Sequence, residues 1–135
     1  MATTQLIERW AEGWTAHDPE LLASIFTDEC VYEDVTLGLV HQGLEEIKAF
    51  RGGYVSVFPD MAVDEMSHFE VGDTVCLEWT MSGTHEGDLP DLPATHRRFV
   101  LRGVSVLTLQ GDRFSACRDY WDRSSLLQQL AGSEA

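Results

Sequence analysis

The hydrophobic period of the chain changes near residue 60, from a helical repeat to strand-like alternation. The alternation predicts four consecutive strands, over about residues 61–71, 75–85, 96–109 and 113–121. Helices followed by such a meander are typical of an α+β domain. We therefore predict a curved antiparallel sheet wrapped around helices, with a cone-shaped pocket between the two layers that suits a ligand.

Three helices are predicted before residue 60. An apolar face at helical spacing covers about residues 4–16 and stops near His17. The third helix follows Gln42-Gly43 and ends at Phe58, where proline stops it. Between these two, Asp18 is an N-cap candidate and Pro19 suits the first helical position, which predicts a short helix carrying Leu21, Leu22, Ile25 and Phe26.

Several shorter features complete the expected fold. Thr27-Asp28-Glu29 is expected to be a turn, followed by a strand over about residues 30–36. Gly52-Gly53 inside the third helix indicates close packing or a bend. A last helix over about residues 124–130 is expected to be capped by Asp122 and to pack through Leu126, Leu127 and Leu130.

Composition and charge bound the function. The 135 residues are 44% hydrophobic and contain no linker-like stretch, which predicts one domain over residues 1–135. The formal charge of −14 comes from 23 acidic and 9 basic residues. This charge repels phosphate backbones and anionic membranes, so we expect no nucleic-acid or membrane partner. It favours a neutral, cationic or deeply enclosed ligand.

The cysteines and the N-terminal segment favour a cytoplasmic protein. The first ten residues carry no apolar signal region, and no apolar run approaches the roughly 18 residues of a membrane span. Cys30, Cys76 and Cys117 are widely spaced and odd in number, which favours buried thiols over a disulfide framework or a CxxC metal site.

Asp119 is the strongest candidate for a reactive group. Alternation after the Gly111-Asp112 turn places Cys117, Asp119 and Trp121 on one face of the last strand. A carboxylate that faces an apolar pocket loses hydration, and its pKa rises toward the range used in proton transfer. The alternative is a structural ion pair with Arg118 or Arg123.

A series of segments in a fixed order carries a family resemblance: Trp10, Trp14 and His17-Asp18, then Val31-Tyr32-Glu33-Asp34, Phe58-Pro59-Asp60, Gly83-Thr84-His85-Glu86-Gly87 and Asp119-Tyr120-Trp121-Asp122. Together they resemble the SnoaL-like polyketide cyclase branch of the nuclear-transport-factor-2-like superfamily, nearly from end to end. The resemblance implies a cystatin-like α+β roll, a homodimer, and a pocket used by cyclases, isomerases, dehydratases and epoxide hydrolases. Such a fold does not by itself decide which reaction is catalysed.

The resemblance also implies residue roles. Asp119 stands where the cyclases have their acid/base aspartate and where limonene epoxide hydrolases have their base carboxylate. Tyr32 stands where the epoxide hydrolases have a water-positioning tyrosine, and Asp34 where they have an asparagine. The segment Glu33-Asp34 is similar to the one that holds the proton-moving aspartate of ketosteroid isomerases.

Two related catalytic sets are incomplete in this chain. The arginine and second aspartate of the epoxide hydrolases would fall near Trp79 and Met81, which can neither orient nor protonate an epoxide oxygen. The oxyanion-hole tyrosine and protonated aspartate of the isomerases would fall near Trp10 and about Gly103. Both complete mechanisms are therefore disfavoured.

Two carboxylates in one pocket could act together as acid and base. If Asp34 and Asp119 share a poorly hydrated space, they titrate together and one can stay protonated near neutral pH. A carboxylate beside a carboxylic acid suits an enolisation or an intramolecular aldol closure. The alternative places Asp34 at the pocket rim, in water.

His85 and His96 flank the loop over residues 86–95, where they are candidates for proton relays at the cavity mouth. Surface or structural roles are the alternative. With Glu86 they have the ligand types of a two-histidine, one-carboxylate metal site, but their spacing matches no known pattern. We therefore expect neither a metal nor another cofactor.

Large apolar side chains are expected to line a cavity for a flat aromatic or polycyclic ligand, with simple core packing as the alternative. These candidate substrate-binding residues are Trp14, Phe50, Tyr54, Phe58, Trp79, Met81 and Trp121.

These features favour a cofactor-independent acid/base enzyme that acts on a hydrophobic, enolisable carbonyl compound, either a polyketide cyclase (intramolecular aldol) or an isomerase. Asp119 is the principal acid/base, Asp34 the second carboxylate, Tyr32 the hydrogen-bond donor and His85 a further candidate. The alternatives are a non-catalytic protein that binds a small hydrophobic ligand, and a dehydratase or epoxide hydrolase of the same fold.

Overall fold

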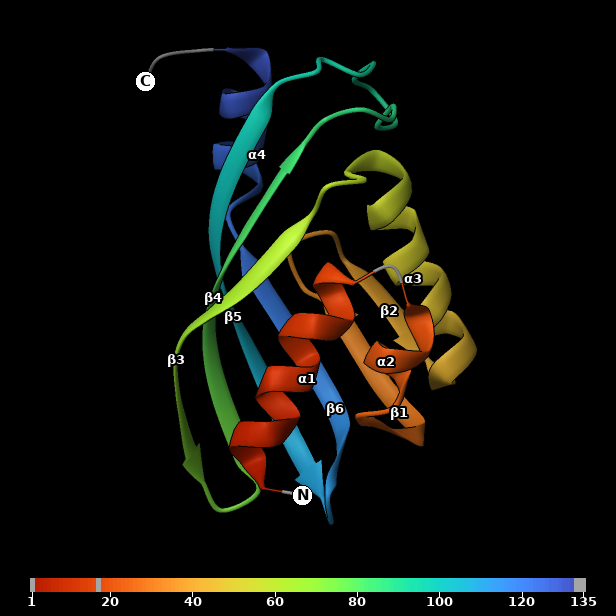
Figure 1. The fold of residues 1–135 in the computed structure, drawn as a ribbon, viewed down its shortest axis with the longest axis vertical. Helices are drawn as coiled ribbons and strands as arrows, with labels where there is room; N and C mark the ends of the chain where they lie inside the picture. The colour runs from red at the N-terminus through yellow and green to blue at the C-terminus, as the bar shows by residue number, and fades with distance from the viewer. Residues whose placement is uncertain (1, 17, 133–135) are drawn as a thin grey trace.

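The computed structural model describes residues 2–16 and 18–132, which form an α+β fold with one curved sheet (Figure 1). The helices are α1 (Thr3–Thr15), α2 (Pro19–Ala23), α3 (Gly43–Val57) and α4 (Arg123–Ala131). The strands are β1 (Phe26–Asp34), β2 (Leu39–Gln42), β3 (Ala62–Val71), β4 (Thr74–Thr84), β5 (Arg98–Gln110) and β6 (Arg113–Trp121). The end of the first helix, expected near His17, falls on a residue outside the described ones.

The sheet has the strand order β2-β1-β6-β5-β4-β3. Strands β3 to β6 form the predicted antiparallel meander, whereas β1 lies parallel to β6 and antiparallel to β2. The two hairpin turns contain Gly72 and Gly111, with φ angles of 60° and 67° that side chains larger than hydrogen rarely allow. The β1–β6 pairing brings the N-terminal half of the chain against the C-terminal strand.

The helices cover the inner face of the sheet. Figure 1 shows α1 lying across the concave side, with α2 and α3 beside it over β1 and β2 and α4 at the far end of β5. The apolar faces of these elements meet in one core, which includes Leu6, Trp10, Leu22, Ile47, Leu77 and Phe114. The sequence-based expectation of a curved sheet wrapped around helices is confirmed.

Both predicted N-caps are present. The Asp18 carboxylate accepts a hydrogen bond from the Glu20 backbone N–H at 3.0 Å, and that of Asp122 accepts one from the Ser125 N–H at 3.2 Å. Pro19 occupies the first turn of α2, where its missing N–H has no helical partner to lose.

The segment after α2 differs from the prediction. Helix α2 ends at Ala23, and Phe26 begins β1, where it pairs with Phe114 of β6. Thr27-Asp28-Glu29 lies inside β1 instead of forming a turn. The pairing shifts register between Phe26 and Val31, and this irregularity accommodates the polar residues without ending the strand.

Three smaller features differ from the sequence-based picture. Gly52 and Gly53 have open space where a Cβ would stand, so close packing does not explain them. Leu127 is exposed, because α4 buries only its Leu126 and Leu130 side. The strand β2 was not predicted, because it is four residues long and its apolar side chains Leu39 and Val40 face solvent.

None of the helices in the described part of the chain is long and apolar enough to span a membrane.

Candidate active site

A cavity lies between the concave face of the sheet and the helices. It is narrow, with about 30 Å³ of room for the centres of water-sized molecules, and its walls are mainly apolar. Most of the predicted lining residues do line it, namely Trp14, Tyr54, Phe58, Trp79, Met81 and Trp121. Phe50 does not: it packs under the cavity wall against Trp14, Tyr32, Tyr54 and the ring of His41.

The side chain of Asp119 stands in the cavity wall on β6 and is 7% exposed. Its Oδ1 accepts hydrogen bonds from Ser105 Oγ at 2.5 Å and from Cys117 Sγ at 3.3 Å, and its Oδ2 accepts one from the Tyr32 hydroxyl. A carboxylate oxygen has room for about two donors. Among the described residues, Oδ1 therefore has its full set of donors, whereas Oδ2 keeps one acceptor position for a substrate proton.

A second layer of contacts holds Ser105. The Trp79 indole N–H donates to Ser105 Oγ at 2.9 Å, so the hydroxyl proton is directed at Asp119. The Trp79 ring lies directly over Gly103, where a Cβ would come within 2.3 Å of the ring. This glycine is required by the close approach of the indole, and the relay from Trp79 through Ser105 to Asp119 depends on it.

Burial raises the pKa of Asp119 to about 6, although the hydrogen bonds from Ser105, Tyr32 and Cys117 act in the lowering direction. The charge of Asp34 contributes to the rise. No ion pair involving Asp119 occurs among residues 2–16 and 18–132, and Arg118 points to the opposite face of β6. The alternative of a pairing with Arg118 or Arg123 is therefore wrong.

Asp34 lies opposite Asp119 in the parallel β1–β6 pairing. Its carboxylate accepts hydrogen bonds from the Tyr54 hydroxyl at 2.8 Å, from Trp121 Nε1 at 3.2 Å and from the Leu37 backbone N–H at 3.1 Å. The residue is only 1% exposed, so the alternative of a solvated carboxylate at the rim is wrong. Tyr54 and Trp121 line the cavity and stand between it and Asp34.

Both tyrosines of the site remain phenols. Burial, followed by the charge of Asp119, raises the pKa of Tyr32 well above its usual range, and burial followed by Asp34 does the same for Tyr54. Each hydroxyl is therefore a permanent donor to its carboxylate. The site thus contains two tyrosine–aspartate pairs, whose carboxylates lie on the adjoining strands β1 and β6.

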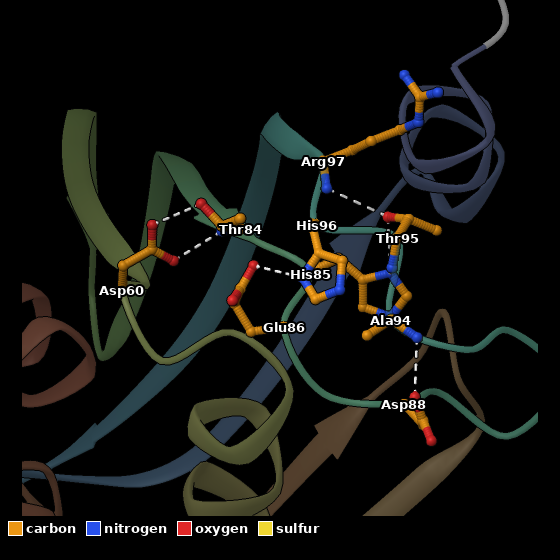
Figure 2. Close-up of polar contacts among 9 residues, drawn as sticks. All are labelled: Asp60, Thr84, His85, Glu86, Asp88, Ala94, Thr95, His96 and Arg97. Carbon is orange, nitrogen blue, oxygen red and sulfur yellow. Dashed lines mark hydrogen bonds and ion pairs between the residues drawn. The ribbon is translucent and has the colours of Figure 1, made fainter.

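The structure does not bring His85 to these carboxylates. The His85 side chain is fully buried outside the cavity lining, and its Nδ1 accepts a hydrogen bond from the Thr95 N–H at 3.1 Å (Figure 2). His96 lies on the surface and pairs with Glu86 at 3.1 Å. Across the described residues, no three His, Cys, Asp or Glu side chains are close enough to hold a metal ion, so these residues do not form a metal site.

Several residues of the site were not identified from the sequence. Ser105 resembles any small residue in a long apolar strand, and Trp10 reads as part of the helical core. Further lining residues are Val63, Phe99, Leu101 and Leu126. Only the alternation of β5 gave a signal, because it places Phe99, Leu101 and Ser105 on the face that α1 covers.

The geometry supports proton transfer at carbon. Asp119 offers one free acceptor position in an apolar cavity, with a pKa of about 6, which is within reach of neutral pH. The Tyr32 and Ser105 donors keep the carboxylate in one orientation, so the base needs no rearrangement as it receives a proton.

Comparison with solved structures identifies the same fold in other proteins. TsrD from Streptomyces laurentii superimposes with a TM-score of 0.84 at 24% identity, over 94% of this chain and 92% of its own. IdmH, a candidate polyketide cyclase from Streptomyces antibioticus, has a TM-score of 0.82 at 20% identity, over 95% of this chain and 97% of its own. A protein of ketosteroid isomerase-like fold from Catenulispora acidiphila, solved with trimethylamine, has a TM-score of 0.84 at 24% identity, over 98% of this chain and 96% of its own.

The sequence itself gives the family. No curated protein matches it. The family described as SnoaL-like polyketide cyclase matches residues 4–130, a span that includes both tyrosine–aspartate pairs and every element of the sheet. The fold comparison agrees with this match. The chain therefore belongs to the SnoaL-like polyketide cyclase family.

Proposed function

We propose that the protein is a cofactor-independent enzyme that removes a proton from a carbon next to a carbonyl group, as a polyketide cyclase or an isomerase. One observation carries this proposal: Asp119 lies in the wall of an apolar cavity, its pKa is about 6, and Oδ2 keeps one acceptor position. A base of this strength is mostly ionised at neutral pH and still accepts a proton readily.

In the proposed reaction, Asp119 Oδ2 takes the proton and the C–H electron pair moves into the carbonyl group to form an enolate. In a cyclase, the enolate carbon then bonds to a second carbonyl carbon of the same molecule. The oxygen of that second carbonyl takes the proton from Asp119, which regenerates the base. In an isomerase, the proton returns to a different carbon. Neither reaction gains or loses atoms, so neither requires a co-reactant.

Asp34 serves in this scheme as a fixed charge rather than as the base. Its carboxylate receives three donors and lies behind Tyr54 and Trp121, out of direct reach of a ligand in the cavity. Burial is the main cause of the raised pKa of Asp119, and the negative charge of Asp34 adds to it, which makes Asp119 a stronger base. His85 has no part in the scheme, because its imidazole is held by Thr95 outside the cavity lining.

Exchange of the α-protons of 2-tetralone for deuterium, followed by proton NMR, tests proton removal without knowledge of the natural substrate. We expect the wild type to accelerate exchange above the buffer rate, with a rate that rises as the pH passes through about 6. Asp119→Asn keeps the shape but removes the base, and should lower the rate by a factor on the order of 100 or more. Asp112→Asn, in the exposed turn before β6, is the matched control and should leave the rate unchanged.

Two outcomes would contradict the proposal. Equal exchange by Asp119→Asn and the wild type would remove Asp119 from the role of base. Binding of 2-tetralone without any acceleration of exchange would instead favour the alternative, a non-catalytic protein that binds small hydrophobic ligands.

A further inference from the structure

All four tryptophans of the chain line the cavity, yet their indole N–H groups fall into two sets. Trp79 donates to Ser105 and Trp121 donates to Asp34, so these two N–H groups serve the carboxylate networks. The Nε1 atoms of Trp10 and Trp14 are buried and have no hydrogen-bond partner among the described residues.

An unpartnered pair of this kind is unusual. More than about 90% of buried polar groups in proteins have a partner, because a buried donor without one loses its hydration and gains nothing in return. Trp10 is 2% exposed and Trp14 is 6% exposed. An indole N–H can only donate, so no rotation or change of protonation state removes the deficit. Both rings line the cavity and each N–H is covered by neighbouring atoms, so a bound molecule that displaces those atoms can supply the missing partner.

The two indoles lie beside the groups that hold the base. Trp10 and Trp14 are four residues apart in α1, which places them on one face of the helix. The ring centroid of Trp10 is 6.2 Å from that of Trp79, and the centroid of Trp14 is 6.2 Å from that of Tyr32. Trp79 and Tyr32 are the two aromatic residues of the Asp119 network.

We propose that the indole N–H groups of Trp10 and Trp14 bind carbonyl oxygens of the ligand and make the cavity selective for ketones over hydrocarbons of the same shape. The inference rests on the proposed function for its choice of ligand, since the described lining of the cavity has two unpaired donors and no Lys or Arg, which calls for neutral or enolate oxygen acceptors. A donor in an apolar wall binds such an oxygen more tightly as it gains negative charge, which also assists enolate formation. A hydrocarbon would leave both N–H groups unpaired and is rejected for that reason.

The matched ligands 2-tetralone and tetralin test this, because they share a bicyclic frame and differ by one carbonyl oxygen. The probe is the set of four indole N–H resonances in nitrogen-15-labelled protein, assigned by single Trp→Phe variants. We expect 2-tetralone to shift the N–H of Trp10 or Trp14 downfield relative to the shift that tetralin causes. The N–H groups of Trp79 and Trp121, already paired, should respond to both ligands alike.

Affinity provides a second measurement. Trp10→Phe and Trp14→Phe keep an aromatic ring and remove one donor each. The variant that loses the binding donor should bind 2-tetralone about fivefold more weakly, the effect of one neutral hydrogen bond, with tetralin affinity unchanged. Should a variant fail to fold, the resonance shifts in the wild type still decide the matter.

The proposal is overturned if tetralin and 2-tetralone shift the Trp10 and Trp14 resonances equally, or if the wild type binds both ligands with equal affinity. These outcomes concern binding alone. They leave proton removal by Asp119 to be decided by deuterium exchange, so failure of this inference is distinguishable from failure of the proposed function.

Discussion

The Asp119 carboxylate is charged at neutral pH in a place that favours its neutral form. Its pKa is about 6 in the folded protein, against the ordinary value of 3.8. The folded state therefore holds this proton more tightly than the unfolded chain does. Stability contributed by the group is highest below about pH 3.8 and falls as the pH rises to about 6. A difference of two pKa units corresponds to about 3 kcal/mol.

Replacement of Asp119 by Asn should accordingly stabilise the protein at neutral pH while it abolishes the proposed reaction. We expect urea unfolding at pH 8 to show a free energy of unfolding higher than that of the wild type by up to about 3 kcal/mol. The difference should shrink as the pH falls from 6 toward 4, where the wild-type carboxyl group becomes protonated. A difference that does not change with pH would show that Asp119 is not strained by its burial.

The identity of Asp119 as a buried carboxylate was predictable from the alternation of β6, but its partner Ser105 was not. Next to the turn, Gln110 pairs with Arg113 and Leu109 pairs with Phe114. If this register continued along the strands, Asp119 would stand opposite Val104. The register shifts between Thr108 and Leu109, so that Ser105 stands opposite Asp119 instead. A bulge of one residue shifts the pairing of every later residue by one position, and no sequence pattern here predicts the bulge.

Among the helices and strands, those with a long hydrophobic period were predicted from the sequence. Segments whose structure is determined by tertiary contacts were not. Strands β3 to β6 and helices α1 and α3 each show a clear period over many residues. Short β2 pairs with the end of β1, and Phe26 at the start of β1 pairs with β6; local sequence does not record either contact. The burial of His85 likewise depends on a tertiary contact, because the chain returns at Thr95 and its backbone N–H donates to His85.

The contact between α1 and α2 depends on one glycine. A Cβ at Gly13 would lie 2.7 Å from the Leu22 Cα, closer than any ordinary contact, whereas a Cβ at Gly52 in α3 would meet nothing within 4 Å. We expect Gly13→Ala to destabilise the protein by about 1–3 kcal/mol through overpacking. Gly52→Ala is the matched control and should stabilise it by about 0.5–1 kcal/mol, because alanine favours a helix.

Thermal or urea unfolding of both variants measures these changes. Equal effects of the two substitutions would mean that α1 and α2 are free to separate, and that the close approach at Gly13 is not required for the fold.

Across the whole molecule, the outer face of the sheet carries apolar side chains that are exposed to solvent. Strand alternation points Val100, Val104 and Val106 of β5 outward, where Val104 pairs with Tyr120 and Val106 lies beside Arg118. Phe69 and Val100 are 63% and 55% exposed. Family resemblance implies a homodimer, and burial of this face against a second copy remains our prediction for how it would form.

The dimer prediction can be tested by sedimentation velocity across protein concentration and salt. With a formal charge of −14, two copies repel each other, so an association through apolar side chains should strengthen as salt screens that repulsion. Val100→Glu should shift the protein toward monomer. Val71→Glu removes a more exposed valine at the end of β3, away from the centre of the face, and should leave association unchanged. A wild type that stays monomeric at all concentrations would rule out the dimer, and equal effects of both variants would place it on another surface.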